Sequence, residues 1–267
     1  MPGPLVAAIQ MVSGPDVAQN CAEAGRLVGE AARRGAAMVV LPEYFPLMGM
    51  SERDKIAARE QDGAGPVQGF LAETAARHRV WLVGGSLPLA VQNPEKVSNT
   101  CLVFDPEGRR VARYDKMHLF DFTAGDECYR ESETIEAGSR VVAFDTPLGR
   151  IGLSICYDLR FPELYRAMSV PDLLAVPAAF TYTTGQAHWE LLLRARAVEN
   201  QCYVVAAAQG GHHANGRVTY GNSMIVDPWG EVLDRLEAGP GVVLAPIDRE
   251  RLGSVRKALP ALSHRRL

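Results

Sequence analysis

Short apolar runs alternate with helical patterns along this chain of 267 residues, and that alternation limits the folds open to it. Residues 5–10 and 37–41 are predicted strands, and residues 17–34 between them have the apolar spacing of a helix. Residues 100–104 and 110–114 are joined by a turn-like Asp-Pro-Glu-Gly sequence and predict a hairpin. This mixture favours a layered α/β architecture in which helices cover sheets.

The remaining segments follow the same alternation to the end of the chain. No linker rich in serine or glycine interrupts it, so residues 1–267 are predicted to form a single domain. The other predicted helices cover residues 67–77, 161–167, 188–199 and 249–257. The other predicted strands cover residues 80–84, 141–144, 150–156, 173–176, 203–208, 223–226 and 242–246.

Charge and composition limit the binding partners and the cellular compartment that we expect for this chain. The formal charge is −3 and no long basic run is present, so we expect no nucleic-acid partner. No apolar run approaches the ~20 residues needed to span a bilayer, and we expect no membrane segment. The N-terminus lacks the charged region of a signal peptide. The five cysteines include no C-x-x-C pair, which is typical of a reducing compartment, so a cytoplasmic protein is expected.

Three apolar strands end in polar residues that suit a ligand site. Glu43 ends the segment MVVLPE, Cys156 follows GLSI, and Thr181 follows LLAVPAAF. In open α/β sheets the ligand crevice lies beyond the carboxyl ends of the strands. We therefore expect these side chains to lie near such a crevice.

Cys156 is the candidate nucleophile. It lies between an apolar strand and a turn that is predicted to enter a helix near Pro162, because proline suits the first helical turn. Backbone N–H groups, the helix start and a neighbouring lysine are expected to lower the pKa of the thiol from ~8.5. The alternative is a buried cysteine that acts as a small hydrophobe, which is the commoner role of an isolated cysteine.

Three ionisable residues are candidate partners for this thiol. Glu43 follows an apolar strand, so partial desolvation is expected to raise the pKa of its carboxyl and suit it to act as a base. Lys116 is flanked by aromatic and apolar residues and offers a fixed positive charge for an oxyanion. Glu131 is a candidate to pair with that lysine. The simpler alternatives are a solvated position for each glutamate and a surface ion pair for the lysine.

Histidine is the rival partner for a catalytic cysteine, and a Cys-His arrangement stays open at this point. His118 and His188 each lie among apolar neighbours, where a structural imidazole is the better interpretation. His212 and His213 lie in a glycine-rich loop without the ligand spacing of a zinc site. The HEXXH, GxSxG, Walker A and GxGxxG patterns are absent, so we expect no metal and no nucleotide or other cofactor.

In combination these segments resemble the three blocks of the nitrilase superfamily of carbon–nitrogen hydrolases, in the same order. The blocks are LPEYF around Glu43, YDKMHLFD around Lys116 and ICYDLRFPEL around Cys156, and Glu131 in YRES matches the second glutamate of the family. The resemblance runs from about residue 6 to the C-terminus. It implies one carbon–nitrogen hydrolase domain over residues 1–267, folded as a four-layer α-β-β-α sandwich. It also implies a Glu-Lys-Cys triad and a homodimer or higher homo-oligomer.

Within the superfamily, the closest similarity is to the deaminated glutathione amidases, sister to the omega-amidases. It rests on LRFPEL, on AAAQGGHHANGRVTYGNSMIVDPWG and on the closing LPALSHRR. The resemblance implies cysteine-dependent hydrolysis of a non-peptide amide through a thioester. The expected substrate is deaminated glutathione, split to 2-oxoglutarate and cysteinylglycine, which implies a role in metabolite repair. The alternatives are omega-amidase activity on 2-oxoglutaramate or another short amide, and a non-catalytic sensor or scaffold.

An anionic substrate of this kind needs cationic and hydroxyl contacts. The backbone N–H of Tyr157 is a candidate oxyanion donor beside Lys116. For Arg160, the first arginine beyond the nucleophile, an ion pair with Glu163 or Asp158 is an equal alternative to substrate binding. The candidates for substrate binding are Arg160, Thr181, Thr183 and Arg217.

Two features depart from the pattern of that branch. Asn222 stands where the branch commonly has a histidine after the glycine. The acidic sequence Asp126-Glu127-Cys128 precedes Glu131. Both are expected at the rim of the substrate site, where they affect the choice of substrate and leave the catalytic residues intact.

Overall fold

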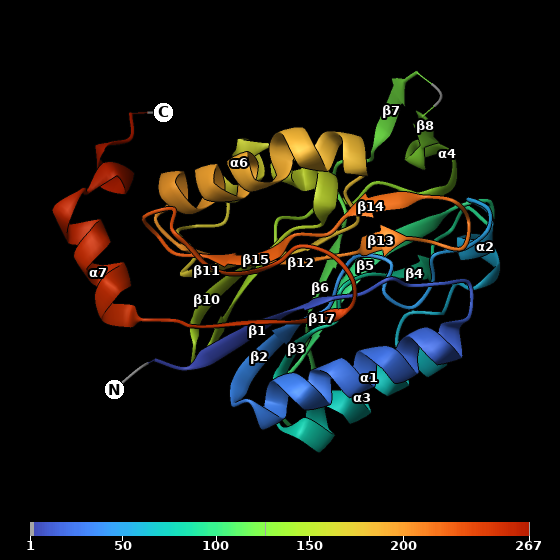
Figure 1. Ribbon diagram of the computed structural model, residues 1–267, viewed down its shortest axis with the longest axis horizontal. Coiled ribbons are helices and arrows are strands. Elements are labelled where there is room, and N and C mark those ends of the chain that lie inside the picture. Colours follow the sequence, from blue (N-terminus) through green and yellow to red (C-terminus); the bar gives the residue numbers. More distant parts are fainter. Residues whose placement is uncertain (1–2, 126, 267) are drawn as a thin grey trace.

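The computed structural model describes residues 3–125 and 127–266, and it has two β-sheets stacked face to face between outer layers of helices (Figure 1). Helices α1 (Val17–Arg33) and α3 (Pro66–His78) cover the outer face of one sheet. Helix α6 (Tyr182–Asn200) covers the outer face of the other. This is the four-layer α-β-β-α sandwich that the sequence resemblance implies.

The first sheet has a parallel centre and antiparallel flanks. Its parallel strands are β1 (Leu5–Gln10), β2 (Ala36–Val40) and β3 (Trp81–Val83). The antiparallel strand beside β1 is β17 (Gly241–Pro246). On the other flank the antiparallel strands are β4 (Leu87–Ala90), β5 (Val97–Phe104) and β6 (Arg110–Asp115). The hairpin predicted around residues 105–109 is the β5–β6 pair.

The second sheet repeats this plan. Its parallel strands are β10 (Gly149–Leu153), β11 (Leu173–Ala178) and β12 (Tyr203–Ala208). Its antiparallel strands are β9 (Ala143–Thr146), β15 (Ser223–Val226) and β16 (Val232–Leu236). The carboxyl ends of parallel strands in both sheets point to the same region, and this places the loops that follow β2 and β10 together.

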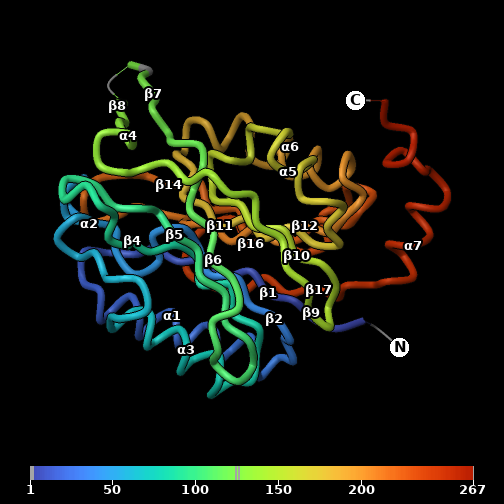
Figure 2. The backbone as a smooth tube through the Cα atoms, turned by 180° about the vertical axis from the view of Figure 1, so that it is seen from behind, coloured from blue at the N-terminus to red at the C-terminus, as the bar shows by residue number. Residues whose placement is uncertain are grey.

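Shorter elements complete the fold. The two small hairpins are β7 (Asp121–Ala124) with β8 (Glu127–Arg130), and β13 (Gly210–His212) with β14 (Val218–Tyr220). The remaining helices are α2 (Asp54–Ala57), α4 (Glu131–Thr134), α5 (Pro162–Arg166), α7 (Arg249–Ala258), and the 3₁₀ helices η1 (Cys156–Arg160) and η2 (Ala261–His264). Both ends of the chain lie on the side of the sandwich that carries α7, in the front and rear views (Figures 1 and 2). No helix in residues 3–125 and 127–266 is long and apolar enough to cross a membrane.

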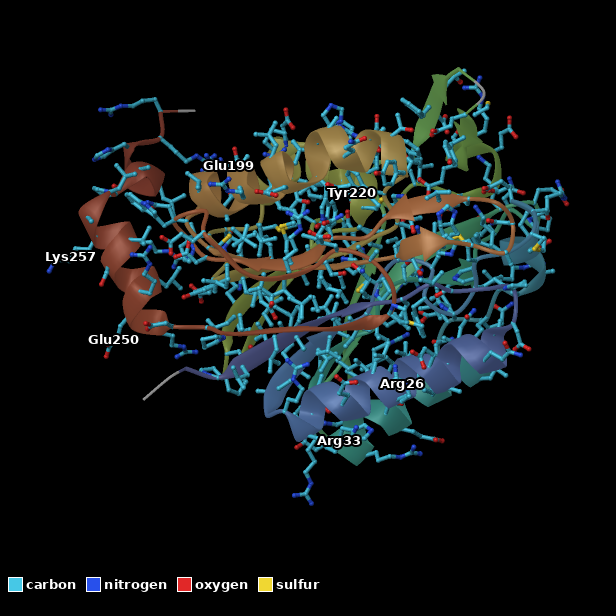
Figure 3. The ribbon with its side chains drawn as sticks, in the orientation of Figure 1. Arg26, Arg33, Glu199, Tyr220, Glu250 and Lys257 are labelled. Carbon is cyan, nitrogen blue, oxygen red and sulfur yellow. The ribbon has the colours of Figure 1, made fainter. Side chains whose placement is uncertain are left out.

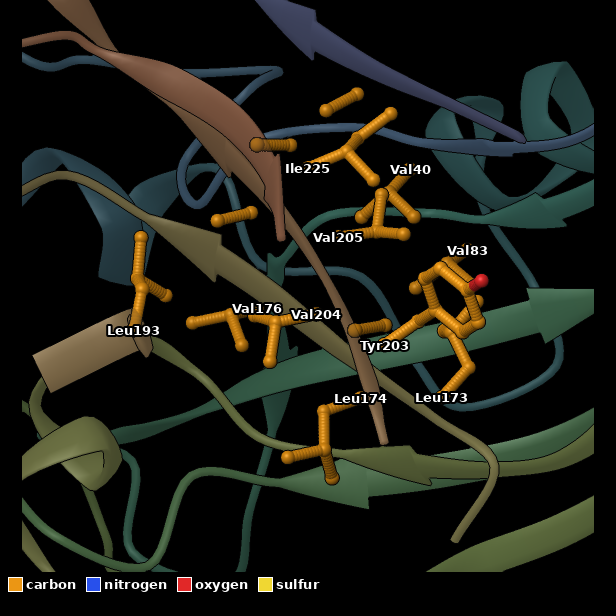
Figure 4. Packing of buried hydrophobic residues seen from close by; sticks show 14 of the residues in the cluster. Val40, Val83, Leu173, Leu174, Val176, Leu193, Tyr203, Val204, Val205 and Ile225 are labelled. Carbon is orange, nitrogen blue, oxygen red and sulfur yellow. The ribbon is translucent and has the colours of Figure 1, made fainter. Parts of the chain in front are cut away.

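Alternation along the strands divides the core into two layers. In β1, Val6 faces the core between the sheets, whereas Ala7 faces the core under α1 and α3. Figure 4 shows Val40 of the first sheet packed near Val205 and Ile225 of the second. The central strands, such as β11 and β12, are buried on both faces, which explains why they appear in the sequence as nearly continuous apolar runs. Arg33 extends from α1 away from the sheets (Figure 3).

Two predicted boundaries are wrong in ways that matter for the site. The strand expected over residues 150–156 ends at Leu153, and Cys156 begins η1 instead. The helix expected from His188 begins earlier, at Tyr182, because the side chain of Thr181 caps it. The weak apolar periodicity of the first turns of α6 concealed that start. Both corrections place polar residues at helix starts, beside the carboxyl ends of strands.

Candidate active site

Residues from three distant segments meet at one cavity. Glu43 follows β2, Lys116 follows β6 directly, and Cys156 is the first residue of η1 after β10. Glu131, the first residue of α4, lines the same cavity. The four residues that the sequence nominated for catalysis therefore lie together in the folded chain.

The backbone at Cys156 is unusual. Its φ is +51°, in the left-handed region that residues other than glycine rarely adopt. Such strained positions cluster at functional sites, because the surrounding structure must hold them in place. The residue keeps 8% of its surface exposed and lines the cavity. Pro162 begins α5 as predicted, six residues after the thiol.

Lys116 is a buried cation held between two carboxylates. Its Nζ donates to Oε1 of Glu43 at 2.9 Å and to Oε1 and Oε2 of Glu131 at 2.9 and 2.8 Å. Nδ2 of Asn99 donates to the same Glu43 oxygen at 3.0 Å. Burial opposes the ammonium charge, but the charges of Glu131 and Glu43 outweigh it and raise the pKa of Lys116. The lysine therefore stays charged and has a fixed direction.

Glu131 is held as an anion. Tyr44 Oη donates to its Oε1 at 2.5 Å, and the backbone N–H of Phe120 donates to its Oε2 at 2.6 Å. Burial favours the protonated acid, but Lys116 and these hydrogen bonds lower the pKa of Glu131. Tyr44, with a φ of +55°, is a residue of the site that the sequence reasoning missed. The available signal was its position directly after Glu43.

The prediction that the pKa of Cys156 is lowered is wrong. Burial raises the pKa of the thiol well above its usual value, and the negative charge of Glu43 raises it further. Lys116 acts in the opposite direction and does not reverse these effects. The prediction counted the helix start and the lysine and left out desolvation. The thiol therefore stays protonated near neutral pH, and a base must remove its proton during any reaction.

Asp158, which the sequence reasoning considered only as an ion-pair partner, links two parts of the site. Its buried carboxylate accepts hydrogen bonds from Tyr114 Oη at 2.7 Å and from the Ile155 N–H at 2.9 Å, both through Oδ2. Oδ1 accepts from the N–H of His118 at 3.0 Å and lies 2.7 Å from its ring Nδ1. The carboxylate thereby ties η1 to the segment that follows Lys116.

The two candidate arginines line the cavity. The guanidinium of Arg160 lies 5.7 Å from the ring centre of Tyr157 and 5.5 Å from that of Phe180. Within the described residues it forms no ion pair with Asp158, whose carboxylate binds other groups, nor with Glu163. Neither carboxylate therefore neutralises its charge. Arg217 lines the cavity from the loop between β13 and β14.

Of the two candidate threonines, the structure brings only one to the cavity. Thr181 lines it, and its Oγ1 accepts the N–H of Thr184 at 3.3 Å. Thr183 is exposed, does not line the cavity, and donates its hydroxyl hydrogen bond to Glu127. Thr183 is the second residue of α6, and the structure does not bring it to the cavity. Tyr157 lines the cavity directly after the nucleophile candidate.

The two departures from the family branch have different positions. Asn222 is buried away from the cavity, which corrects the expectation that it lies at the rim. Its carbonyl accepts from Trp189 Nε1 at 2.8 Å and its Oδ1 accepts from Arg235 at 2.7 Å, so it joins α6 to β16. Asp126 lies outside the described residues. Cys128 is exposed on β8 and does not line the cavity.

The histidines are also placed by the structure. His118 stacks on Phe161 with 3.7 Å between ring centres, as expected of a structural imidazole. His188 is exposed on α6, so the expectation of an apolar environment is wrong, because helical spacing turns it outward. Its Nδ1 lies 3.3 Å from Nη1 of Arg160. His213 is buried between Ser13 and other polar groups. Within the part of the chain that the structure describes, no cluster of His, Cys, Asp or Glu has the arrangement of a metal site.

A comparison with protein families settles what kind of chain carries this site. A family model described as carbon-nitrogen hydrolase matches residues 5–257. The chain belongs to the carbon–nitrogen hydrolase family. It is 44% identical to the deaminated glutathione amidase of Synechocystis sp., over 98% of this chain and 97% of that protein.

Solved structures of other carbon–nitrogen hydrolases share the fold. Saccharomyces cerevisiae Nit3, a member of branch 10 of the nitrilase superfamily, matches with a TM-score of 0.89 and 31% identity. The match covers 100% of this chain and 97% of that one. A variant of the amidase from Nesterenkonia sp. AN1 matches with a TM-score of 0.83 and 26% identity, over 99% of this chain and 94% of that one. That structure has the acetamide moiety of fluoroacetamide covalently added to the active-site cysteine.

These findings establish the general activity. The chain is a nitrilase-superfamily hydrolase of carbon–nitrogen bonds other than peptide bonds, an amidase with a cysteine nucleophile. The sensor or scaffold considered from the sequence is therefore set aside.

Proposed function

We propose that the chain hydrolyses deaminated glutathione to 2-oxoglutarate and cysteinylglycine, through a thioester on Cys156. The observation that carries the proposal is the meeting of Cys156, Glu43 and Lys116 in one cavity. The name of the Synechocystis relative supports the choice of substrate. We further propose that residues 1–267 act as one catalytic domain in the cytoplasm, in metabolite repair.

The first half of the proposed reaction forms the thioester. Glu43 takes the proton from Cys156 while the sulfur attacks the amide carbonyl. Asn99 and Lys116 both donate to Oε1 of Glu43, and within the described residues no hydrogen-bond donor occupies Oε2. That second oxygen is available to the thiol. Glu43 then gives the proton to the amide nitrogen as the carbon–nitrogen bond breaks, and the amine leaves.

The oxyanion and the second half of the reaction use the same groups. Lys116 Nζ and the backbone N–H of Tyr157 stabilise the tetrahedral oxyanion, each donor contributing roughly 3–4 kcal/mol. Glu43 next takes a proton from water, whose oxygen attacks the thioester carbon. The carbon–sulfur bond breaks, the sulfur regains a proton from Glu43, and the acid product leaves. Glu131 positions Lys116 throughout. No metal or organic cofactor takes part in these steps.

The charges of the cavity support an anionic substrate. Arg160 and Arg217 line it, and Thr181 adds a hydroxyl group. The runner-up is omega-amidase activity on 2-oxoglutaramate, which shares the 2-oxo acid half and would use the same nucleophile.

Release of 2-oxoglutarate from the two keto-amides tests the proposal. We expect the purified chain to prefer deaminated glutathione, and a Cys156→Ser variant to lose activity on it. A Cys21→Ser variant is the matched control, because Cys21 lies on α1, away from the cavity. Intact-protein mass spectrometry should show an acyl adduct at Cys156 during turnover. Absence of 2-oxoglutarate from both keto-amides would overturn the substrate assignment, and full activity of Cys156→Ser would overturn the mechanism.

We also propose a homodimer that forms through α6. Leu191 and Val198 are seven residues apart on one face of this helix, with 67% and 48% of their surface exposed. Trp229 is 53% exposed in the turn before β16, and a Cβ added at the neighbouring Gly230 would lie 2.8 Å from Cγ2 of Val198. An apolar surface of this kind is typical of a subunit interface.

A further inference from the structure

A second hollow adjoins the active-site cavity. The two hollows share three wall residues, Tyr44, Glu52 and Arg217. The other walls of the second hollow come from residues 47–55 and from Asn215, whose Nδ2 donates to the Gly49 carbonyl at 2.7 Å. It therefore lies between the loop after the first glutamate of the site and the tip of the β13–β14 hairpin.

Arg217 stands at the junction of the two hollows. Its guanidinium lies 4.8 Å from the ring centre of Tyr129, and Nη1 lies 3.9 Å from the sulfur of Met48. Its Nε is buried without a hydrogen-bond partner among residues 3–125 and 127–266. A buried guanidinium usually binds a carboxylate, and none of the described carboxylates pairs with this one.

The other charged groups of the second hollow balance each other. Glu52 accepts a hydrogen bond from Lys55 at 2.6 Å, so this acid and this base form an ion pair. This ion pair does not neutralise the charge of Arg217, so the hollow has a net positive charge. A ligand group that neutralises this positive charge is an anion.

Arg160 occupies a different position. It lines the main cavity and not the second hollow, and it belongs to the turn that begins with Cys156. Three arginines without a carboxylate partner in the described chain, Arg130, Arg160 and Arg217, line the cavity, and only Arg217 among them also lines the second hollow. Tyr44, which directly follows Glu43, separates the hollows. The side of the cavity next to Glu43 is where a departing amine must receive its proton.

We propose that the second hollow is the leaving-group subsite and that Arg217 binds the terminal carboxylate of the departing peptide, whereas Arg160 binds the carboxylate of the acyl half. This inference rests on the proposed function. Deaminated glutathione has a carboxylate at each end of the scissile amide, so it occupies both arginines. 2-Oxoglutaramate has one carboxylate, and its leaving group is ammonia. Arg217 is therefore the residue that selects the larger substrate.

Steady-state kinetics with three substrates tests this assignment. The substrates are deaminated glutathione, its C-terminal amide and 2-oxoglutaramate. Arg217→Gln should lower kcat/KM for deaminated glutathione roughly 10- to 100-fold, the range for loss of a hydrogen bond to a charged group. The same variant should stay within twofold of the wild type on the other two substrates. Arg217→Lys should recover part of the loss, and Arg160→Gln should slow all three substrates.

The controls separate the possible failures. Arg26→Gln is the matched surface control, because Arg26 pairs with Glu23 on α1 and should leave all three rates unchanged. Activity of Arg217→Gln on 2-oxoglutaramate shows that the variant is folded. An equal loss on all three substrates, or no loss on deaminated glutathione, would overturn the subsite. If the wild type hydrolyses none of the three, the proposed function fails, and the subsite assignment falls with it.

Discussion

Replacing Asp158 with asparagine should weaken both the fold and the reaction, because this carboxylate accepts four hydrogen bonds without exposure to solvent. An amide keeps one acceptor oxygen and puts an NH₂ group in place of the other. The hydroxyl of Tyr114 can rotate and the ring of His118 can change tautomer, but a backbone N–H has no such freedom. Either the N–H of Ile155 or that of His118 then loses its acceptor.

The expected loss of stability follows from the one backbone N–H that loses its acceptor. One orphaned buried donor costs roughly 1–3 kcal/mol, and the bonds that remain lose the strength that the charge gave them. We expect Asp158→Asn to lower the free energy of unfolding by about 2–4 kcal/mol, which shifts Tm by roughly 2–4 °C per kcal/mol. Since Asp158 ties η1 to the segment after Lys116, kcat for amide hydrolysis should fall as well.

Denaturant unfolding and amide hydrolysis, measured on the same preparations, provide the assay. The matched control is Asp145→Asn, which removes a carboxylate of 77% side-chain exposure that pairs with Arg150. Its effect should stay within about 0.5 kcal/mol. Wild-type stability together with wild-type kcat in Asp158→Asn would refute the view that this carboxylate holds the two segments together.

Three further predictions concern the ionisable groups and the surface. Burial and the charge of Glu43 raise the pKa of Cys156. The pH midpoint of Cys156 alkylation by iodoacetamide, measured by mass spectrometry, should therefore lie above pH 9. The midpoint should fall in the Glu43→Gln variant. Amide hydrolysis should be lost in the same variant, and an unchanged midpoint would contradict the electrostatic account. Glu131→Gln should lower kcat far more than it raises KM, because the carboxylate holds the lysine and not the substrate; a pure KM effect in steady-state kinetics would refute this. Leu191→Glu should shift sedimentation velocity from dimer to monomer, and a sedimentation coefficient equal to the wild-type value would exclude the α6 face.

Much of the sandwich was predictable, because its central strands are buried on both faces. Runs such as residues 203–208 and 223–226 have the same bounds in the sequence prediction and in the structure. Short strands were missed, among them β4, β16 and the two small hairpins. Their apolar residues are too few to produce a run, and their pairing depends on partners far along the chain.

The residues of the candidate site divide in the same way, into those that the sequence predicted and those that it did not. Glu43, Lys116 and Cys156 were found because each follows an apolar strand or lies in a motif block, and the strand ends converge. Asp158 and Tyr44 were not found, because their importance depends on contacts across the fold. The sign of the pKa shift of Cys156 was missed for a related reason. Local sequence shows the neighbouring charges, whereas desolvation depends on the whole packed structure.

The raised pKa of the thiol is consistent with the proposed mechanism once the charges are followed through it. With a neutral thiol, Glu43, Lys116 and Glu131 together carry one net negative charge. A free thiolate would add a second negative charge, and two such charges 4 Å apart repel by roughly 4 kcal/mol near a protein surface. Passing the proton to Glu43 during attack avoids this, because the negative charge leaves the carboxylate as it appears on the carbonyl oxygen. Both positions adjoin the ammonium of Lys116, so the cation need not move to follow the charge.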